Sequence, residues 1–160
     1  MITDFRELLG INVDLEPRLK DSITNFTLVF SRAEQVLMEG NGSIRKTHEY
    51  AEELADKLGM DAGIAFDYFR NRYITSIDGE SRLDALCPGK PRDRQKVFDA
   101  FVKVDPSSKD KMEAVLNVCL RLRHNLFHGN KWQYGLAGQE ENLEHATLLL
   151  SRCLNRIARL

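Results

Sequence analysis

Apolar residues recur at intervals of three and four along most of the chain, which is the spacing of one face of an α-helix. The clearest series runs from Leu15 to Leu37 and predicts an amphipathic helix over residues 17–38. Pro17 suits the first turn of that helix, where its missing N–H is not needed. The Gly40-Asn41-Gly42 segment is expected to end the helix, because these residues favour turns.

The same spacing predicts further helices over residues 47–58, 61–74, 95–102, 109–128 and 140–160. Gly59 and Asp61 suit the end of one helix and the cap of the next. Residues 78–94 contain two glycines and two prolines and are expected to be irregular, with at most one short turn. No alternation typical of strands remains, so the sequence predicts an all-α bundle of at least four main helices in one domain, residues 1–160.

The composition agrees with a single soluble domain. Of the 160 residues, 42% are hydrophobic and 29% are charged, which is enough apolar material for a core. No apolar run approaches the roughly 20 residues that span a bilayer, and the N-terminus lacks the pattern of a signal peptide. We therefore expect a cytoplasmic protein without membrane contact, in which Cys119 and Cys153 are buried free thiols on apolar helix faces.

The formal net charge of −1 conceals an uneven distribution. Residues 88–131 contain ten Lys or Arg against five Asp or Glu, whereas the rest of the chain is acidic. This segment predicts a surface that attracts anions, unless its cations simply lie on solvated helix faces.

One segment gathers chemically active side chains at the end of the 109–128 helix. Within eight residues it holds Arg121, Arg123, His124, Asn125 and His128. Arginine binds phosphate oxygens through its planar fork, and histidine transfers protons near neutral pH. Metal-free RNA cleavage needs these groups: a base for the 2′-hydroxyl, an acid for the leaving 5′-oxygen and a cation for the phosphorane.

Helical geometry assigns these residues to faces. At about 100° per residue, one side of the helix is an apolar seam, and the opposite side carries Asn117, Arg121, His124, Asn125 and His128. Arg123 falls in the apolar sector, about 140° from His128. A buried arginine needs an acidic partner, a phosphate or a subunit interface, and Glu34 is a candidate acidic partner.

The string LRHNLFHG, residues 122–129, resembles the signature of the HEPN superfamily (higher eukaryotes and prokaryotes nucleotide-binding domains). That signature is an arginine followed by a polar residue and, a few positions later, a histidine. Arg123, His124 and His128 fill these places. Residues 26–34 resemble the first helix of such domains. The resemblance implies a HEPN-like helical bundle with the motif near the C-terminal end of a long late helix.

The resemblance also implies a function. Such domains are metal-independent endoribonucleases that cleave RNA from the 2′-hydroxyl in toxin–antitoxin, abortive-infection and antiviral systems. They form homodimers whose motifs face each other, use no cofactor, and are controlled by an antitoxin or another regulatory partner. By this resemblance Arg123 stabilises the phosphate, His128 transfers protons and His124 is the polar motif residue.

Other residues near the motif are candidates for RNA or phosphate contacts. Arg121 and Asn125 share the polar face with the histidines, and either Arg121 or Arg123 is the main phosphate ligand. After the helix, Trp132 can stack on a base with Lys131 near a phosphate. The same two residues could instead fix the loop to the bundle.

Several readings of the motif stay open. His128 could serve as a cation at the negative end of the helix dipole. His124 and His128 have the i, i+4 spacing of two metal ligands, but no third ligand is evident in the sequence, so no metal is expected. The alternative function is a catalytically inactive helical module that binds RNA, nucleotide or a partner protein, and a third is a structural subunit with an Arg123–Glu34 ion pair.

Overall fold

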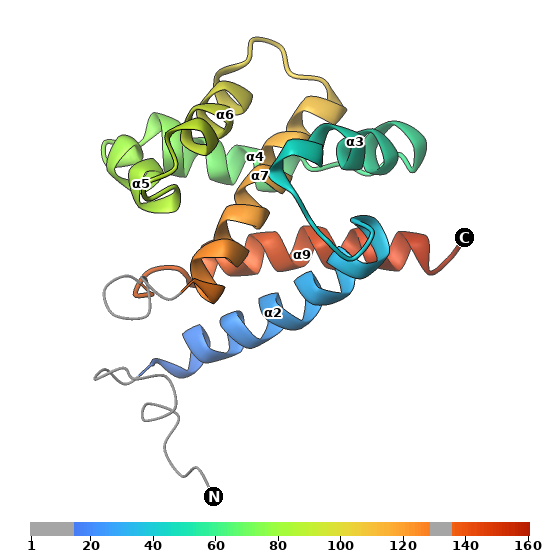
Figure 1. Cartoon of the computed structure of the whole chain (residues 1–160), viewed down its shortest axis with the longest axis horizontal. Helices are drawn as coiled ribbons and strands as arrows, with labels where there is room; N and C mark the ends of the chain where they lie inside the picture. Colours follow the sequence, from blue (N-terminus) through green and yellow to red (C-terminus); the bar gives the residue numbers. More distant parts are fainter. Residues whose placement is uncertain (1–14, 129–135) are drawn as a thin grey trace, which may run out of the picture.

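The computed structural model describes residues 15–128 and 136–160, and every regular element in these ranges is helical (Figure 1). The main helices are α2 (Pro17–Leu37), α3 (Thr47–Ala51), α4 (Gly63–Arg70), α5 (Gly79–Leu86), α6 (Pro91–Val102), α7 (Ser108–Phe127) and α9 (Glu140–Ile157). A 3-10 turn, Ile44–Lys46, precedes α3, and the π-helical turns Glu52–Lys57 and Asn71–Thr75 continue α3 and α4. The all-α class predicted from the sequence is confirmed.

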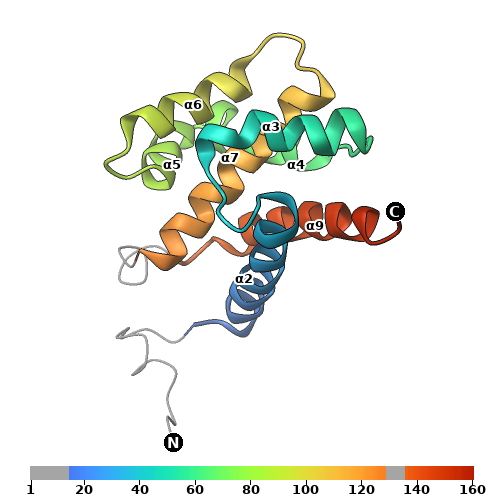
Figure 2. The same cartoon turned by 45° about the vertical axis from the view of Figure 1, so that its right-hand side comes forward.

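Helix α7 runs through the middle of the bundle. Helices α3, α4, α5 and α6 lie on one side of it, and α2 and α9 lie against each other on the other side (Figures 1 and 2). Twelve of the 20 residues of α7 are buried, so the helix is covered around most of its circumference. Its C-terminal end therefore meets segments that are far apart in the sequence.

The ends of the long helices follow from local chemistry. Pro17 stands in the first turn of α2, as predicted. At the start of α7 the Ser107 Oγ accepts a hydrogen bond from the N–H of Asp110 at 3.1 Å, and the Ser107 N–H donates to the Asp110 carboxylate at 2.9 Å. This reciprocal capping box satisfies two N–H groups that the helix leaves unpaired.

The prediction that residues 78–94 are irregular is wrong. They contain α5 and the first turn of α6, separated by only the four residues 87–90. Gly89 adopts a left-handed φ of 64°, which suits the connection after a helix, and Pro91 stands in the first turn of α6. The glycine and the prolines therefore mark a boundary between two helices, and α6 begins four residues earlier than predicted.

The core is built from aromatic and aliphatic side chains of several helices. Phe66 of α4 stacks on Phe101 of α6 with ring centroids 5.1 Å apart. Cys119 and Cys153 are buried free thiols, as predicted, and burial raises the pKa of Cys119 to about 12. Among the helices of the described ranges, none is both long enough and apolar enough to cross a membrane.

Candidate functional site

The C-terminal end of α7 carries two histidines, His124 and His128, called here the histidine pair. They stand one turn apart on the same face, and their ring centroids are 4.3 Å apart with an interplanar angle of 37°. His128 is exposed and His124 is half-buried. The helix ends at His128, whose N–H donates to the His124 carbonyl at 3.0 Å. The two imidazoles are near enough to act on one bound group.

The surroundings of His124 favour its neutral form. Burial lowers the pKa of His124, and the positive charges of Arg121, His128 and Lys90 lower it further, whereas Asp93 acts in the opposite direction. A histidine with a lowered pKa is a free proton acceptor over more of the neutral range.

Arg121 lies beneath this pair and is almost fully buried, with 4% of its side chain exposed. Its Nη1 is 3.0 Å from the Asp93 carboxylate, and its Nε donates to the carbonyl of Leu86 at 3.3 Å. The Nδ2 of Asn125 donates to the same carbonyl at 2.9 Å. Arg121 and Asn125 therefore hold the end of α5 and the start of α6 against α7.

Three residues on the polar side of α7 do not reach solvent. Asn117, Arg121 and Asn125 are buried, because α5 and α6 pack on that side of α7. Hydrogen bonds and an ion pair satisfy most of their polar atoms, but the Nη2 of Arg121 has no hydrogen-bond partner within residues 15–128 and 136–160. Of the predicted polar face, only the histidine pair reaches solvent.

Arg123 points away from Arg121, toward α2. Its Nη2 lies 3.3 Å from the Glu34 Oε1, with 35% of the arginine side chain and 15% of the glutamate side chain exposed. The guanidinium also lies 5.5 Å from the ring centroid of Phe127, a residue that is 60% exposed. The ion pair considered from the sequence is confirmed, and both Glu34 and Phe127 orient the motif arginine.

The two arginines therefore differ in what they can bind. A guanidinium carries five N–H donors. Those of Arg121 face Asp93, the Leu86 carbonyl and the protein interior. Arg123 is a third exposed, and only its Nη2 donates to Glu34. Because more of its side chain is exposed, Arg123 rather than Arg121 is the arginine that an external phosphate can reach.

Several site residues were not predicted. Lys90 and Asp93 act on His124 and Arg121 from the start of α6, and their only signal in the sequence is the basic character of residues 88–131. Lys131 and Trp132 lie outside the described residues. Within the part of the chain that is described, no three His, Cys, Asp or Glu side chains gather in a way that could hold a metal ion.

No family model matches the chain, and no curated protein or solved structure is significantly similar to it. Its function is therefore inferred from the residues of this site and from the sequence motif that they contain.

Proposed function

We propose that this chain is a metal-independent endoribonuclease of the HEPN type. The observation that carries the proposal is the histidine pair, with ring centroids 4.3 Å apart at an exposed helix end and a lowered pKa for His124. Two imidazoles close enough to act on one phosphate group are what acid and base catalysis of RNA cleavage requires. The same histidines, together with Arg123, form the sequence motif that resembles that of such enzymes.

The proposed reaction is transphosphorylation. Neutral His124 removes the proton of the ribose 2′-hydroxyl, and the 2′-oxygen attacks the adjacent phosphorus. Protonated His128 donates its proton to the 5′-oxygen as the phosphorus–oxygen bond breaks. The products are a 2′,3′-cyclic phosphate on one fragment and a 5′-hydroxyl on the other, with the histidines in exchanged protonation states.

Arg123 is the proposed ligand of the reacting phosphate. Glu34 holds one side of its guanidinium, so the remaining donors are oriented before substrate binds. On a regular helix Arg123 is about 100° from His124 and about 140° from His128. A homodimer would complete the site, with Arg123 of one copy facing the histidine pair of the other.

The biological setting follows from the resemblance alone. We propose a cytoplasmic role in toxin–antitoxin, abortive-infection or antiviral defence, with an antitoxin or regulatory partner that controls cleavage. The buried groups of the site, Arg121 and Asn125, hold helices together in this account and do not contact RNA.

A catalytically inactive binding module is the second candidate. The Arg123–Glu34 ion pair favours a role without catalysis, because a compensated arginine is also what a purely structural contact contains. The salt dependence of binding distinguishes a module that binds RNA from one that binds a protein partner. RNA affinity that falls steeply as the salt concentration rises indicates a phosphate-binding surface. The affinity of an apolar groove for a protein partner depends much less on salt.

Incubation with structured and single-stranded RNA in excess EDTA tests the proposal. We expect cleavage without metal and fragments that end in a 2′,3′-cyclic phosphate, as identified by mass spectrometry. Intact RNA at every protein concentration, with the dimer verified by light scattering, would instead support the binding module.

A further inference from the structure

A groove of about 550 Å³ lies between α6 and α7, separate from the histidine pair. Arg92 and Lys96 of α6, with Lys103 just after the end of that helix, line one wall, and Asp110, Glu113 and Asn117 of α7 line the other. A volume of this size is that of a pocket for a small molecule or for one or two nucleotides rather than for a duplex.

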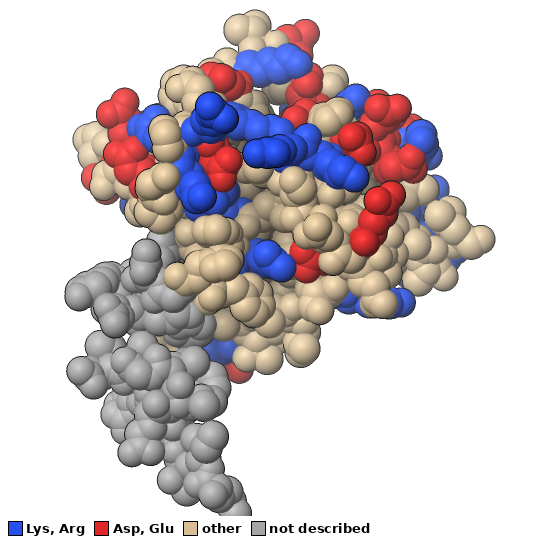
Figure 3. All heavy atoms as spheres, in the orientation of Figure 1, with Lys and Arg blue, Asp and Glu red and all other residues tan. Residues whose placement is uncertain are grey.

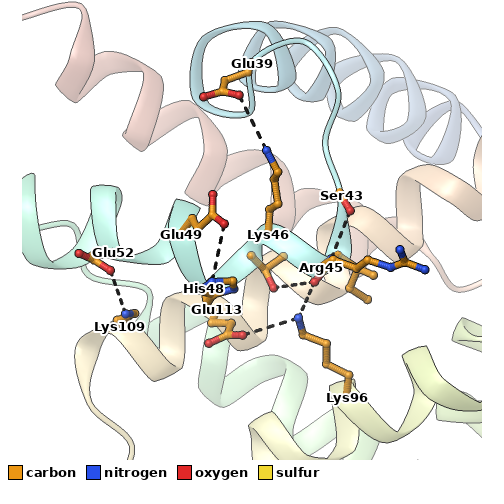
Figure 4. A network of polar contacts seen from close by, with 12 residues as sticks. Glu39, Ser43, Arg45, Lys46, His48, Glu49, Glu52, Lys96, Lys109 and Glu113 are labelled. Carbon is orange, nitrogen blue, oxygen red and sulfur yellow. Dashed lines mark hydrogen bonds and ion pairs between the residues drawn. The ribbon is translucent and has the colours of Figure 1, made fainter.

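Two of the three acidic residues that line the groove, Asp110 and Glu113, pair with lysines, and the third, Asp99, accepts a hydrogen bond from Gln95 Nε2. Lys103 pairs with Asp110 at 2.6 Å, and the hydrogen bond from Lys103 is the main reason that the pKa of Asp110 is lowered to about 2. Lys96 lies 3.8 Å from Glu113 and also donates to the backbone carbonyl of Ile44 (Figure 4). The wall on α7 therefore does not repel an anionic ligand as strongly as its carboxylates alone suggest.

Positive charge without an ion-pair partner remains at and near the groove. Arg92 lines it, Arg45 follows Ile44, whose carbonyl accepts from Lys96 of the groove, and Lys90 directly precedes α6. All three side chains are exposed, and none has an ion-pair partner among the described residues. Figure 3 shows Lys and Arg side chains gathered over α6 and the start of α3. In Figure 4 the Arg45 guanidinium points away from the polar network, with no interaction drawn to it. This positive charge thus attracts phosphate groups.

A buried polar group on the groove wall lacks a partner. Asn117 is fully buried, and one end of its amide is 2.7 Å from the Thr47 hydroxyl. The other end, Nδ2, has no hydrogen-bond partner among the described residues. Buried amides are nearly always hydrogen-bonded, so a ligand acceptor such as a base carbonyl or a phosphate oxygen would complete the group.

Charged residues at the start of α6 lie between the groove and the histidine pair. Arg92 is next to Asp93, which pairs with Arg121, and the charge of Lys90 acts on His124. Asn117 stands one turn before Arg121 on α7 and is about 16 Å along the helix axis from His128. A single-stranded RNA that leaves the histidine pair would pass Lys90 and Arg92 before it enters the groove.

We infer that the groove between α6 and α7 binds the single-stranded flank of the RNA, a few nucleotides from the bond that is cleaved. The inference rests on the proposed function for the identity of its substrate. Arg45, Lys90 and Arg92 contact phosphates, and the Asn117 amide contacts a base or phosphate oxygen. Binding by phosphate contacts is independent of base sequence.

The test measures binding of an unstructured, fluorescein-labelled RNA of about 12 nucleotides by anisotropy. The RNA carries 2′-O-methyl groups, which remove the nucleophile and prevent cleavage. The double variant Arg45→Glu/Arg92→Glu reverses two positive charges at the groove, and the double variant Arg152→Glu/Arg156→Glu on α9 is the matched control, with the same charge change outside the groove. All four arginines are exposed, so unchanged melting temperatures verify folding.

We expect the Arg45→Glu/Arg92→Glu variant to bind at least about 10-fold more weakly than wild type and to lower the salt slope of log affinity by about 1 to 1.5, which corresponds to two lost phosphate contacts. The control is expected to retain the wild-type affinity and slope. Equal values for the Arg45→Glu/Arg92→Glu variant and the control would overturn the groove assignment. Cleavage of unmodified RNA by wild type is scored separately: its absence would overturn the proposed function, while the binding data still decide on the groove.

Discussion

The guanidinium of Arg123 meets the carboxylate of Glu34 where α7 packs near the end of α2, with Nη2 3.3 Å from Oε1. The same carboxylate oxygen accepts the N–H of Gly42 at 3.0 Å. One glutamate thus fixes both the motif arginine and the turn that follows α2. Because a third of the arginine side chain stays exposed, the contact orients the guanidinium without enclosing it.

Two substitutions of Glu34 separate its roles. Glu34→Gln keeps an oxygen for the Gly42 N–H but loses the charge, and we expect it to cost below roughly 1 kcal/mol of the free energy of unfolding. Glu34→Ala removes both interactions and should cost roughly 1–3 kcal/mol. Urea denaturation followed by circular dichroism measures both. Equal losses for the two variants would show that the Gly42 contact contributes nothing.

The two arginines of the motif segment should respond oppositely to the same change. Arg121→Met leaves the Asp93 carboxylate without its buried donor, while the Leu86 carbonyl keeps only the donor from Asn125, and the change should cost roughly 1–3 kcal/mol of stability. Arg123→Met should cost less than roughly 1 kcal/mol, because its ion pair is partly solvated, but should abolish RNA cleavage. Urea titrations and cleavage assays on both proteins measure this. A stable, inactive Arg121→Met protein would assign the phosphate to Arg121 instead.

The lowered pKa of His124 gives a pH dependence with a definite sign. The unfolded chain binds a proton at this histidine more tightly than the folded chain, so stability falls as the pH drops below the ordinary histidine value of about 6.5 and levels off below the folded pKa. Imidazole C–H signals in two-dimensional NMR report the pKa directly. We expect His124 to titrate below the ordinary value.

Lys90 provides the control for that titration. Its positive charge is one cause of the lowered pKa of His124, and the side chain is exposed. Lys90→Ala should therefore raise the pKa of His124 without unfolding the protein. Titration of His124 at or above the ordinary value in wild type would remove the basis for its role as the base.

Mixing two inactive proteins tests the shared site of the proposed dimer. In a heterodimer of Arg123→Ala and His128→Ala chains, one site regains an intact arginine and an intact histidine if these come from different copies. We expect each variant alone to be inactive and the mixture to recover activity, up to about half that of wild type for the heterodimer fraction. If the mixture stays inactive although subunits exchange, the arginine and the histidine act within one chain.

The long helices could be predicted from the sequence because their apolar spacing is continuous. Helices α2 and α7 begin and end within one residue of the predicted bounds. Helix α5 was missed because Gly79, Pro88 and Gly89 are residues typical of loops and turns, although Gly79 stands at the first position of the helix. The π-helical turns after α3 and α4 have no sequence signal of comparable strength.

Which polar residues of the site are buried depends on contacts between helices, and the spacing of apolar residues along α7 does not show these contacts. Asn117 and Arg121 lie on the side of α7 opposite its apolar seam, yet they are buried because α6 packs on that side of the helix. The Arg123–Glu34 pair was predictable because a charged residue in an apolar sector requires an acidic partner. The histidine pair was predictable because i, i+4 residues on a helix are always neighbours.

The rate of RNA cleavage in excess EDTA by His128→Ala, compared with wild type and with His48→Ala, tests the central claim most directly. His48 is an exposed histidine on α3 outside the site and is the matched control. We expect His128→Ala to be at least about 10²-fold slower with an unchanged melting temperature, since the side chain is exposed at a helix end, and His48→Ala to retain full activity. Equal cleavage rates for wild type and His128→Ala would contradict the account.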